Sequence, residues 1–170
     1  MDPPAAVVDY DPAWPTLFEE IRSRVEPLVA DLDGWVEHVG STSGPGLAAK
    51  PIIDIDVVVR TAAQVALAVE RLAVIGYIHQ GDRGIVGREA FQPPPRTPYH
   101  HLYVVVEGSK PHSDHIDLRN YLRRHPDEAQ RYAGRKRKIA YLLGNDRDAY
   151  LTAKSDIISE FLQRARRSPS

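Results

Sequence analysis

The chain has 170 residues and a mass of 19.0 kDa, which suits one compact domain. Because 22 lysines and arginines nearly balance 23 aspartates and glutamates, the net charge of −1 excludes a uniformly basic nucleic-acid-binding surface. The absence of cysteine excludes disulfides, thiolate metal sites and a cysteine nucleophile. With no apolar run near the roughly 20 residues of a membrane helix and no basic signal region, we expect a soluble cytoplasmic protein with neither a membrane nor a nucleic-acid partner.

Helical and extended segments alternate in the first half of the chain. Apolar residues recur at helical spacing from 14 to 32, and Pro27 is expected to kink or split this helix. Residues 35–39 predict a short strand, and the β-branched run 52–59 predicts a longer one. Residues 62–74 then return to a helical pattern.

The second half begins with turns and ends with helices. Glycines and prolines between residues 76 and 98 predict turns and an extended loop, and residues 100–107 predict another strand. From about residue 113 onward the pattern is helical. We therefore predict a single α+β domain over residues 1–170, with a core from about 8 to 162 and a frayed tail at 163–170.

Charge is distributed unevenly along this chain. Residues 1–34 carry two arginines and eight acidic residues, a net charge of −6. Residues 121–170 carry twelve lysines and arginines and six acidic residues, a net charge of +6. We interpret the acidic start as a solvated surface, and we expect the basic helices at the end to pack beside a pocket for an anionic ligand.

Two aspartates interrupt the strand predicted at 52–59. Because side chains alternate along a strand, Asp54 and Asp56 face the same side, with Cα atoms roughly 6.6 Å apart. Carboxylates this close repel each other unless a cation neutralises them, and oxygen ligands suit Mg²⁺. One interpretation is therefore that Asp54 and Asp56 bind Mg²⁺. The alternative is an edge strand whose outer face is simply in contact with water.

A Gly-Ser-Thr-Ser segment precedes the aspartates. Glycine permits a tight turn, and hydroxyls with free backbone N–H groups bind phosphate oxygens. The residues expected to contact phosphate are Gly40, Ser41, Thr42, Ser43 and Lys50. Pro45 and Gly46 are expected to begin a short helix whose N-terminus adds positive charge. The segment lacks the Gly-Lys-Ser/Thr end of a Walker A loop, and the alternative is a flexible connection without a ligand.

The order of strand, Gly-Ser turn and Asp-x-Asp strand resembles the signature of the nucleotidyltransferase superfamily typified by DNA polymerase beta. More closely, HVGSTSGPGLAAKPIIDI at 38–55 resembles the hallmark of the GrpB-like family in that superfamily. The resemblance extends from about Val8 to Leu162 through VVDYDPAWPTLFEEI, GIVGREAF, LRNYLRRHP, RYAGRKRKIA and DRDAYLTAKSDII. It implies a mixed sheet flanked by helices, with a C-terminal helical layer.

The resemblance also implies an activity. It points to metal-dependent transfer of a nucleotidyl group from a nucleoside triphosphate to an acceptor that the sequence does not identify. The expected ligand is a nucleoside triphosphate or another phosphate-bearing small molecule. In this reading Asp54 and Asp56 are the catalytic, metal-binding carboxylates, and Gly40 and Ser41 contact the triphosphate. The alternative is a non-catalytic nucleotide- or CoA-binding module, since similar domains occur fused to dephospho-CoA kinases.

The superfamily's third carboxylate has no clear counterpart in this sequence. On the strand predicted at 100–107, His101 and Glu107 share one face and are the candidates to lie opposite the aspartates. We take His101 as the third catalytic candidate. Members of the GrpB-like family generally have His-Leu-His where this chain has His-Leu-Tyr at 101–103.

Several cations and one further histidine are candidates for substrate binding. They lie in family-like segments and are Arg88, Arg119, Lys136, Lys154 and His38. Arginine can clamp phosphate through two parallel hydrogen bonds, and Lys136 falls on the apolar-facing side of its predicted helix. His38 would orient substrate or relay a proton, or else cap the strand end by hydrogen bonding.

A cluster of histidines provides a different reading. Four of the seven histidines form this cluster in the sequence, and they are His100, His101, His112 and His115. Imidazoles near carboxylates can bind zinc, which would suggest a hydrolase. The chain has no His-Glu-x-x-His pattern, and the spacing of His112 and His115 is a weak zinc signal.

Overall fold

A computed structural model describes residues 6–168. Its centre is a mixed five-stranded sheet in the order β1-β2-β5-β4-β3, in which β2 and β5 are parallel and the other neighbours are antiparallel. The strands are β1 (Trp35–Val39), β2 (Ile53–Val59), β3 (Ile78–His79), β4 (Arg88–Gln92) and β5 (His100–Val106). The predicted α+β class, with a mixed sheet flanked by helices, is confirmed.

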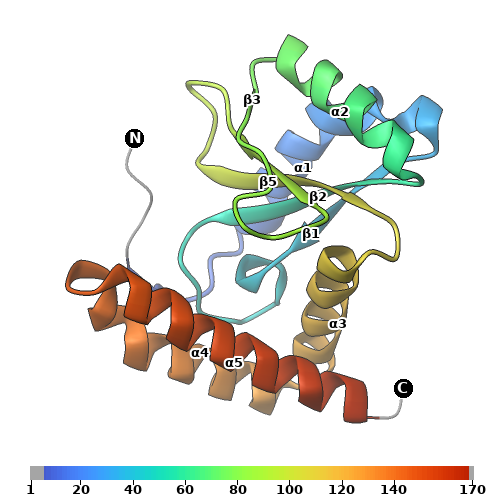
Figure 1. Ribbon diagram of the computed structural model, residues 1–170. Coiled ribbons are helices and arrows are strands. Elements are labelled where there is room, and N and C mark those ends of the chain that lie inside the picture. The colour runs from blue at the N-terminus through green and yellow to red at the C-terminus, as the bar shows by residue number, and fades with distance from the viewer. Residues whose placement is uncertain (1–5, 169–170) are drawn as a thin grey trace.

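Helices cover the two faces of the sheet differently (Figure 1). Their bounds are α1 (Trp14–Val25), α2 (Ala62–Val74), α3 (Lys110–Arg124), α4 (Pro126–Ile139) and α5 (Arg147–Arg167). α1 and α2 pack on one face and share the main hydrophobic core with it. α3 contacts β1 and β5, while α4 and α5 lie side by side below the sheet as a C-terminal helical layer.

α1 forms because its apolar residues recur at helical spacing and face the sheet. Its buried residues are Trp14, Phe18, Ile21 and Val25. The α-helix ends at Val25, and Pro27 lies in the 3₁₀ turn Glu26–Leu28 that follows. Proline removes an interior helical hydrogen bond, so the predicted break is confirmed.

β2 is buried on its core face and carries the aspartates on the other. Ile53, Ile55 and Val57 are at most 2% exposed and belong to the main core. Asp54 and Asp56 lie on the opposite face, as the alternation of a strand predicts. The exposed-edge alternative is wrong, because β1 and β5 flank β2 and Asp56 is fully buried.

β1 is an edge strand whose outward polar groups are covered by side chains. The N–H of Val36 donates to the Glu26 carboxylate at 3.3 Å. The carbonyl of His38 accepts from the guanidinium of Arg119, on α3, at 3.2 Å. These hydrogen bonds hinder another strand from pairing with the free edge of β1, and the one from Arg119 also connects α3 to β1.

Three sequence predictions need correction. The segment 76–98, predicted as turns and loop, also contains β3 and β4, whose short length and flanking glycines hide the strand pattern. The short helix expected at Pro45 and Gly46 is absent, and the helical turn is instead the 3₁₀ segment Ser41–Ser43. A hydrogen bond from the Ser43 N–H to the Gly40 carbonyl closes that turn.

The third correction concerns the C-terminus, because α5 continues to Arg167 where a frayed tail was predicted. Ion pairs stabilise its last turns: Arg164 pairs with Glu128 at 2.8 Å, and Arg166 pairs with Asp114 at 2.6 Å. The final two residues of the predicted tail, 169 and 170, lie outside the described residues.

Within residues 6–168, no helix combines the length and apolar character needed to cross a membrane.

Phe161 tests whether the C-terminal layer contributes to stability. Its side chain on α5 is fully buried and meets the Tyr132 ring of α4 edge-on, at 5.1 Å between centroids. We expect Phe161→Ala to lower the free energy of unfolding by about 3–5 kcal/mol, measured by urea denaturation, because it leaves a cavity. The matched control Leu151→Ala, at a 50% exposed position on the same helix, should cost less than about 0.5 kcal/mol. Equal losses for the two variants would contradict the prediction.

Candidate functional site

The candidate site lies on the sheet face that carries the two aspartates. In the β2–β5 pairing, Asp54 lies opposite His101 and Asp56 lies opposite Tyr103. On the other side of β2, Glu37 of β1 lies opposite Asp56. The histidine predicted as the third catalytic residue is therefore beside Asp54. The other candidate for that position, Glu107, instead pairs with Arg60 at 2.6 Å on the exposed surface.

Each aspartate is hydrogen bonded to a histidine. His101 Nδ1 lies 2.8 Å from Asp54 Oδ1, and His115 Nδ1, from α3, lies 2.8 Å from Asp56 Oδ2. Since a carboxylate only accepts, each Nδ1 donates. Asp56 is fully buried, and its Oδ1 has no hydrogen-bond partner among the described residues. One carboxylate oxygen therefore remains free to bind a cation.

The surroundings shift the pKa values of these groups in different directions. Burial alone would raise the pKa of Asp54, but the hydrogen bond from His101 and the positive charge of Lys154 outweigh it and lower this pKa. Burial dominates at Asp56 and raises the pKa of its carboxyl group despite the hydrogen bond from His115. Burial would lower the pKa of His115, but its contact with Asp56 outweighs burial and raises it.

The Gly40 turn packs directly against Asp54. Gly40 has φ = 72°, in the left-handed region, and a Cβ there would collide with the Asp54 carboxylate. Glycine is therefore required for both conformation and close approach. The Thr42 hydroxyl donates to the Ile52 carbonyl at 3.1 Å and the Ser43 hydroxyl donates to Gly40, so both predicted phosphate contacts instead hold the turn in shape.

Two lysines from the C-terminal layer reach this region. Lys136 Nζ, on α4, donates to Ser41 Oγ at 2.7 Å and lies over the Tyr132 ring. The pKa of Lys136 is lowered to about 7, chiefly by burial and also by the charge of neighbouring Lys154 of α5, while Asp54 opposes the shift. Ser41, Lys136 and Lys154 therefore lie near one another on the Asp54 side of the site, and their predicted contacts with substrate stay a prediction.

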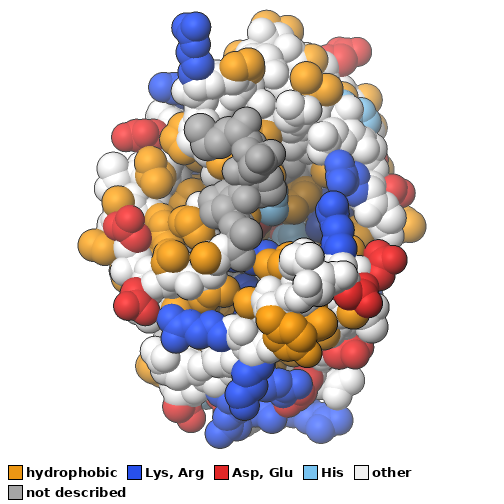
Figure 2. Space-filling view, turned by 90° about the vertical axis from the view of Figure 1, so that its left-hand side faces the viewer, with side chains coloured by type: hydrophobic (Ala, Val, Ile, Leu, Met, Phe, Trp, Pro, Cys, Tyr) orange, Lys and Arg blue, Asp and Glu red, His pale blue; other side chains and the backbone are white. Residues whose placement is uncertain are grey.

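Two further predicted cations, Arg88 and Lys50, stack on aromatic rings near the site. The guanidinium of Arg88, on β4, lies 4.2 Å from the centre of the Tyr103 ring, and its buried Nε has no partner among the described residues. Lys50 Nζ lies 4.6 Å from the centre of the Tyr150 ring, and burial lowers the pKa of Lys50. Histidine side chains lie deep on the face shown in Figure 2, between the sheet and the helical layer, with Lys and Arg side chains bordering them.

His38 lies on the other face of the sheet and contacts the core. Its Nε2 lies 2.9 Å from Thr42 Oγ1, and its ring stacks on Phe18 at 4.8 Å. Burial lowers the pKa of His38 to about 4, and Arg123 and Arg119 act in the same direction. Of the two roles considered from sequence, the structure shows the hydrogen bond that holds the strand end.

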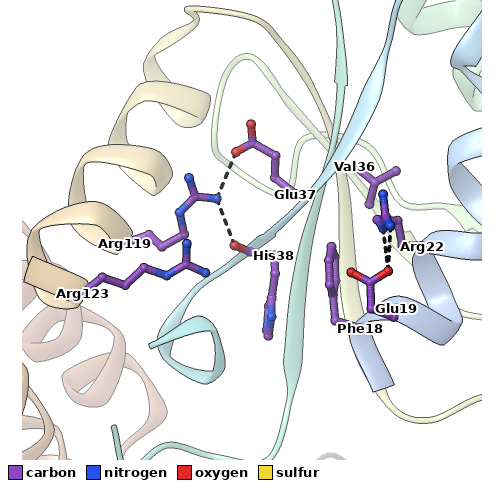
Figure 3. A pocket seen from close by; sticks show the side chains of 8 residues that line it. All are labelled: Phe18, Glu19, Arg22, Val36, Glu37, His38, Arg119 and Arg123. Carbon is purple, nitrogen blue, oxygen red and sulfur yellow. Dashed lines mark hydrogen bonds and ion pairs between the residues drawn. The ribbon is translucent and has the colours of Figure 1, made fainter. Parts of the chain in front are cut away.

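Arg119 belongs to a separate cavity at the β1 edge. It pairs with Glu37 at 3.2 Å as well as with the His38 carbonyl, so it does not point at the aspartates. The cavity measures about 440 Å³ and opens between α1, β1 and α3 (Figure 3). It is lined by Phe18, Glu19, Arg22, Val36, Glu37, His38, Arg119 and Arg123.

The aspartate pair suits Mg²⁺. The two side chains offer hard oxygen donors on one face, and the buried Oδ1 of Asp56 lacks any partner in residues 6–168. Within the same range, no group of three or more histidine, aspartate or glutamate side chains is arranged to hold a metal by itself. One or two carboxylates completed by substrate phosphates and water are the usual ligands of Mg²⁺.

His115 is the site residue that the sequence did not single out for this role. The sequence suggested His115 only as a zinc candidate together with His112, but in the structure the two side chains contact different partners. His115 binds Asp56, whereas His112 Nδ1 accepts from the Gly108 N–H and its Nε2 lies 4.0 Å from Glu37. The contact of His115 with the sheet depends on long-range packing of α3. The spacing of His115 and Arg119, one helical turn apart, nevertheless indicates that one face of this helix meets the sheet.

Comparison with known proteins identifies a family. A model described as GrpB protein matches residues 4–164. UPF0157 protein YqkA of Bacillus subtilis is 32% identical over 161 residues, covering 95% of this chain but only 47% of that protein. A UPF0157 protein of Streptomyces coelicolor is 36% identical over 160 residues, covering 92% of this chain and 82% of the relative. The crystal structure of conserved protein GrpB from Enterococcus faecalis has a TM-score of 0.78 and 32% identity over 95% of this chain and 100% of that one.

More distant structures share the fold. The GLD-2/RNP-8 complex matches with a TM-score of 0.59 and 11% identity, over 96% of this chain and 63% of that one. Cid1 in complex with its short product ApU matches with a TM-score of 0.53 and 11% identity, over 81% of this chain and 41% of that one.

A dephospho-CoA kinase of Mycolicibacterium paratuberculosis is similar in sequence. It is 27% identical over 187 residues, covering 95% of this chain and 46% of the kinase.

The depressed pKa of Lys136 predicts a specific pH dependence of stability. Its pKa falls from 10.5 to about 7 on folding, so between these values the unfolded chain binds more protons at this group than the native protein does. Stability therefore rises with pH over that window. We expect urea denaturation from pH 7 to pH 10 to show the free energy of unfolding of the wild type rising relative to Lys136→Met, by about a few kcal/mol.

The control for this prediction is Lys138→Met, since Lys138 is exposed on the same helix. Its stability should follow the wild type at every pH. Parallel curves for the wild type and Lys136→Met would contradict the prediction.

Proposed function

This chain belongs to the GrpB family, and we propose that it transfers a nucleotidyl group from a nucleoside triphosphate to an acceptor, with Asp54 and Asp56 holding Mg²⁺. The observation that carries the proposal is the packing of the Gly40 turn against Asp54, next to the unpartnered buried oxygen of Asp56. In this proposal the turn would bind phosphate beside the carboxylate pair that would bind the cation. The fold shared with Cid1, which was solved with its product ApU, supports the same reading.

The triphosphate would lie between the Ser41 turn and the helical layer. Lys136 already donates to Ser41 Oγ, and the charge of Lys154 acts on Asp54. A phosphate oxygen is a stronger acceptor for an ammonium group than a neutral hydroxyl is. Ser41 and the two lysines would therefore bind the phosphates, and Arg88 would add a guanidinium from the β4 side of the same face.

In the proposed reaction, an acceptor hydroxyl loses its proton to water and its oxygen forms a bond to the α-phosphorus, while the bond to the departing diphosphate breaks. Bound Mg²⁺ supplies charge neutralisation and alignment of phosphate oxygens. Lys136 and Lys154 stabilise the negative charge that grows on the diphosphate. His101 and His115 hold the two carboxylates in fixed orientations through their Nδ1–H groups.

A second candidate function is binding of a nucleotide or CoA without turnover. The observation that favours it is the histidine opposite Asp54, where the superfamily resemblance led us to expect a carboxylate. The similarity to a dephospho-CoA kinase, of which this chain covers less than half, is compatible with an accessory role. The two candidates share the pocket and differ in whether a phosphorus–oxygen bond is broken.

The first test is calorimetric titration with ATP, GTP, CTP, UTP and CoA, with and without Mg²⁺. We expect at least one triphosphate to bind only with Mg²⁺, and Asp56→Asn to weaken that binding at least about tenfold, which is about 1.4 kcal/mol. Asn removes a fully buried carboxylate without changing its shape, so the fold should persist. The matched control Glu107→Gln, a carboxylate paired with Arg60 on the surface, should bind as the wild type does.

The second measurement is release of diphosphate from the bound nucleotide. Turnover that Asp56→Asn abolishes supports the transferase. Mg²⁺-dependent binding of a nucleotide or CoA with no diphosphate release supports the binding module. Failure of every triphosphate and CoA to bind, or equal binding by the wild type and Asp56→Asn, would overturn the use of this site for both functions.

A further inference from the structure

We infer that the cavity at the β1 edge binds a small molecule that carries one carboxylate group, held by the guanidiniums of Arg119 and Arg123. The inference goes beyond the proposed function and does not depend on it, because neither Asp54 nor Asp56 lines this cavity. The cavity measures about 440 Å³, and pockets for small molecules measure about 300–1,000 Å³. The residues that line it supply an uncompensated positive charge, free N–H donors and an apolar wall.

The charged side chains of the cavity leave one positive charge uncompensated. Arg22 pairs with Glu19 at 2.7 Å, and Arg119 pairs with Glu37 at 3.2 Å. Arg123 has no carboxylate partner within residues 6–168, where its one hydrogen bond goes to a backbone carbonyl. A ligand with a single carboxylate would balance this remaining charge.

Both guanidiniums of α3 are held in place by backbone carbonyls and keep other N–H groups free. Arg119 Nη1 donates to the His38 carbonyl at 3.2 Å, and Arg123 Nε donates to the Ser43 carbonyl at 3.0 Å. In the described part of the chain, Nη2 of Arg119 and both terminal nitrogens of Arg123 have no acceptor. Figure 3 shows the two side chains extending from α3 toward β1. A carboxylate accepts parallel hydrogen bonds from such nitrogens, and donors already in position lower the entropy cost of binding.

The two arginines are also close enough to repel each other. They are four residues apart, so they project from the same face of α3, where like charges destabilise a helix. Burial and the charge of Arg119 lower the pKa of Arg123, while Glu37 opposes the shift. A bound carboxylate would reduce this repulsion. A phosphate dianion would add a second negative charge beside Glu37 and Glu19, so the observations favour a carboxylate.

The cavity offers an apolar wall for the rest of the ligand. Phe18 of α1 and Val36 of β1 line it, and the Phe18 ring stacks on the ring of His38 with 4.8 Å between centroids. Burial lowers the pKa of His38 to about 4, so this ring is neutral at pH 7 and adds no charge to the cavity. A carboxylate on an aromatic body would therefore contact both the arginines and the apolar wall.

The test is fluorine NMR of 4-fluorobenzoate titrated with the full chain at constant ionic strength. We expect saturable binding to the wild type, and we expect Arg123→Gln to weaken it at least about tenfold, because the uncompensated charge is lost. Glutamine keeps a nitrogen at the position of the arginine Nε, so the hydrogen bond to the Ser43 carbonyl can persist. The matched control Arg124→Gln removes the next arginine, which is exposed and does not line the cavity, and it should bind as the wild type does.

Two further probes test the chemistry of the ligand. 4-Fluorobenzamide has a similar shape without the charge, and it should bind at least about tenfold more weakly than 4-fluorobenzoate. Inorganic phosphate should displace 4-fluorobenzoate only at a higher concentration than unlabelled benzoate does. The reverse order of the two competitors would overturn the assignment to a carboxylate.

The remaining outcomes separate this inference from the proposed function. Asp56→Asn should bind 4-fluorobenzoate as the wild type does, because the aspartate pair does not line the cavity. Loss of 4-fluorobenzoate binding in this variant would place the probe at the aspartate pair and overturn the inference. Absence of saturable binding to the wild type, or equal binding by the wild type and Arg123→Gln, would also overturn it. Each of these results leaves the proposed function to its own titration with nucleotides.

Discussion

Two neighbouring carboxylates on one strand, of which Asp56 is fully buried, are the constraint around which the rest of the molecule is arranged. Removing an ionised carboxylate from water costs several kcal/mol unless partners compensate it, and Asp56 is fully buried beside Asp54. Compensation comes from elements far apart in sequence: β5 supplies His101 and α3 supplies His115. The parallel pairing of β2 with β5 and the docking of α3 on the sheet are therefore both coupled to these two side chains. The proposed cation-dependent function accounts for the cost of burying Asp56 beside a second carboxylate.

In the proposed function, the Gly40 turn completes a binding site around that pair. Its positive φ and its contact with Asp54 allow only glycine, and internal hydrogen bonds from Thr42 and Ser43 fix its shape. His38 supports the turn from the core face through Thr42. With these groups committed to structure, Ser41 is the hydroxyl of the segment that faces a cation, through Lys136. In the proposed function the site is therefore formed before a ligand binds, which would lower the entropy cost of binding.

Sequence patterns predicted the features of this structure that depend only on residues close together in the chain. The alternation of β2 placed Asp54 and Asp56 on one face, and Pro27 marked the break after α1. β3 and β4 were not predicted because these short strands among glycines are stabilised by strand pairing rather than by their own propensity: β3 pairs with β4, and β4 pairs with β5. The role of His115 was not predicted because its partner Asp56 is 59 positions away, and no sequence spacing encodes the angle at which α3 packs on the sheet. The opposite orientation of His38 also depends on the register of β1 against β2, which only the assembled sheet defines.

The basic C-terminal segment shows why the location of charge matters more than its total. Three consecutive cations of α4 have three different surroundings: Arg135 pairs with Glu160 at 2.7 Å, Arg137 pairs with Asp9 at 3.1 Å, and Lys136 is buried beside Ser41. A helix turns by about 100° per residue, so neighbours in sequence must point apart. The outer two form surface ion pairs that contribute little to stability, since such pairs are worth about 0–1 kcal/mol. Only the middle one is desolvated enough for its charge to act strongly on a bound anion. The net charge of +6 over residues 121–170 therefore reduces, at the site itself, to Lys136 and its neighbour Lys154.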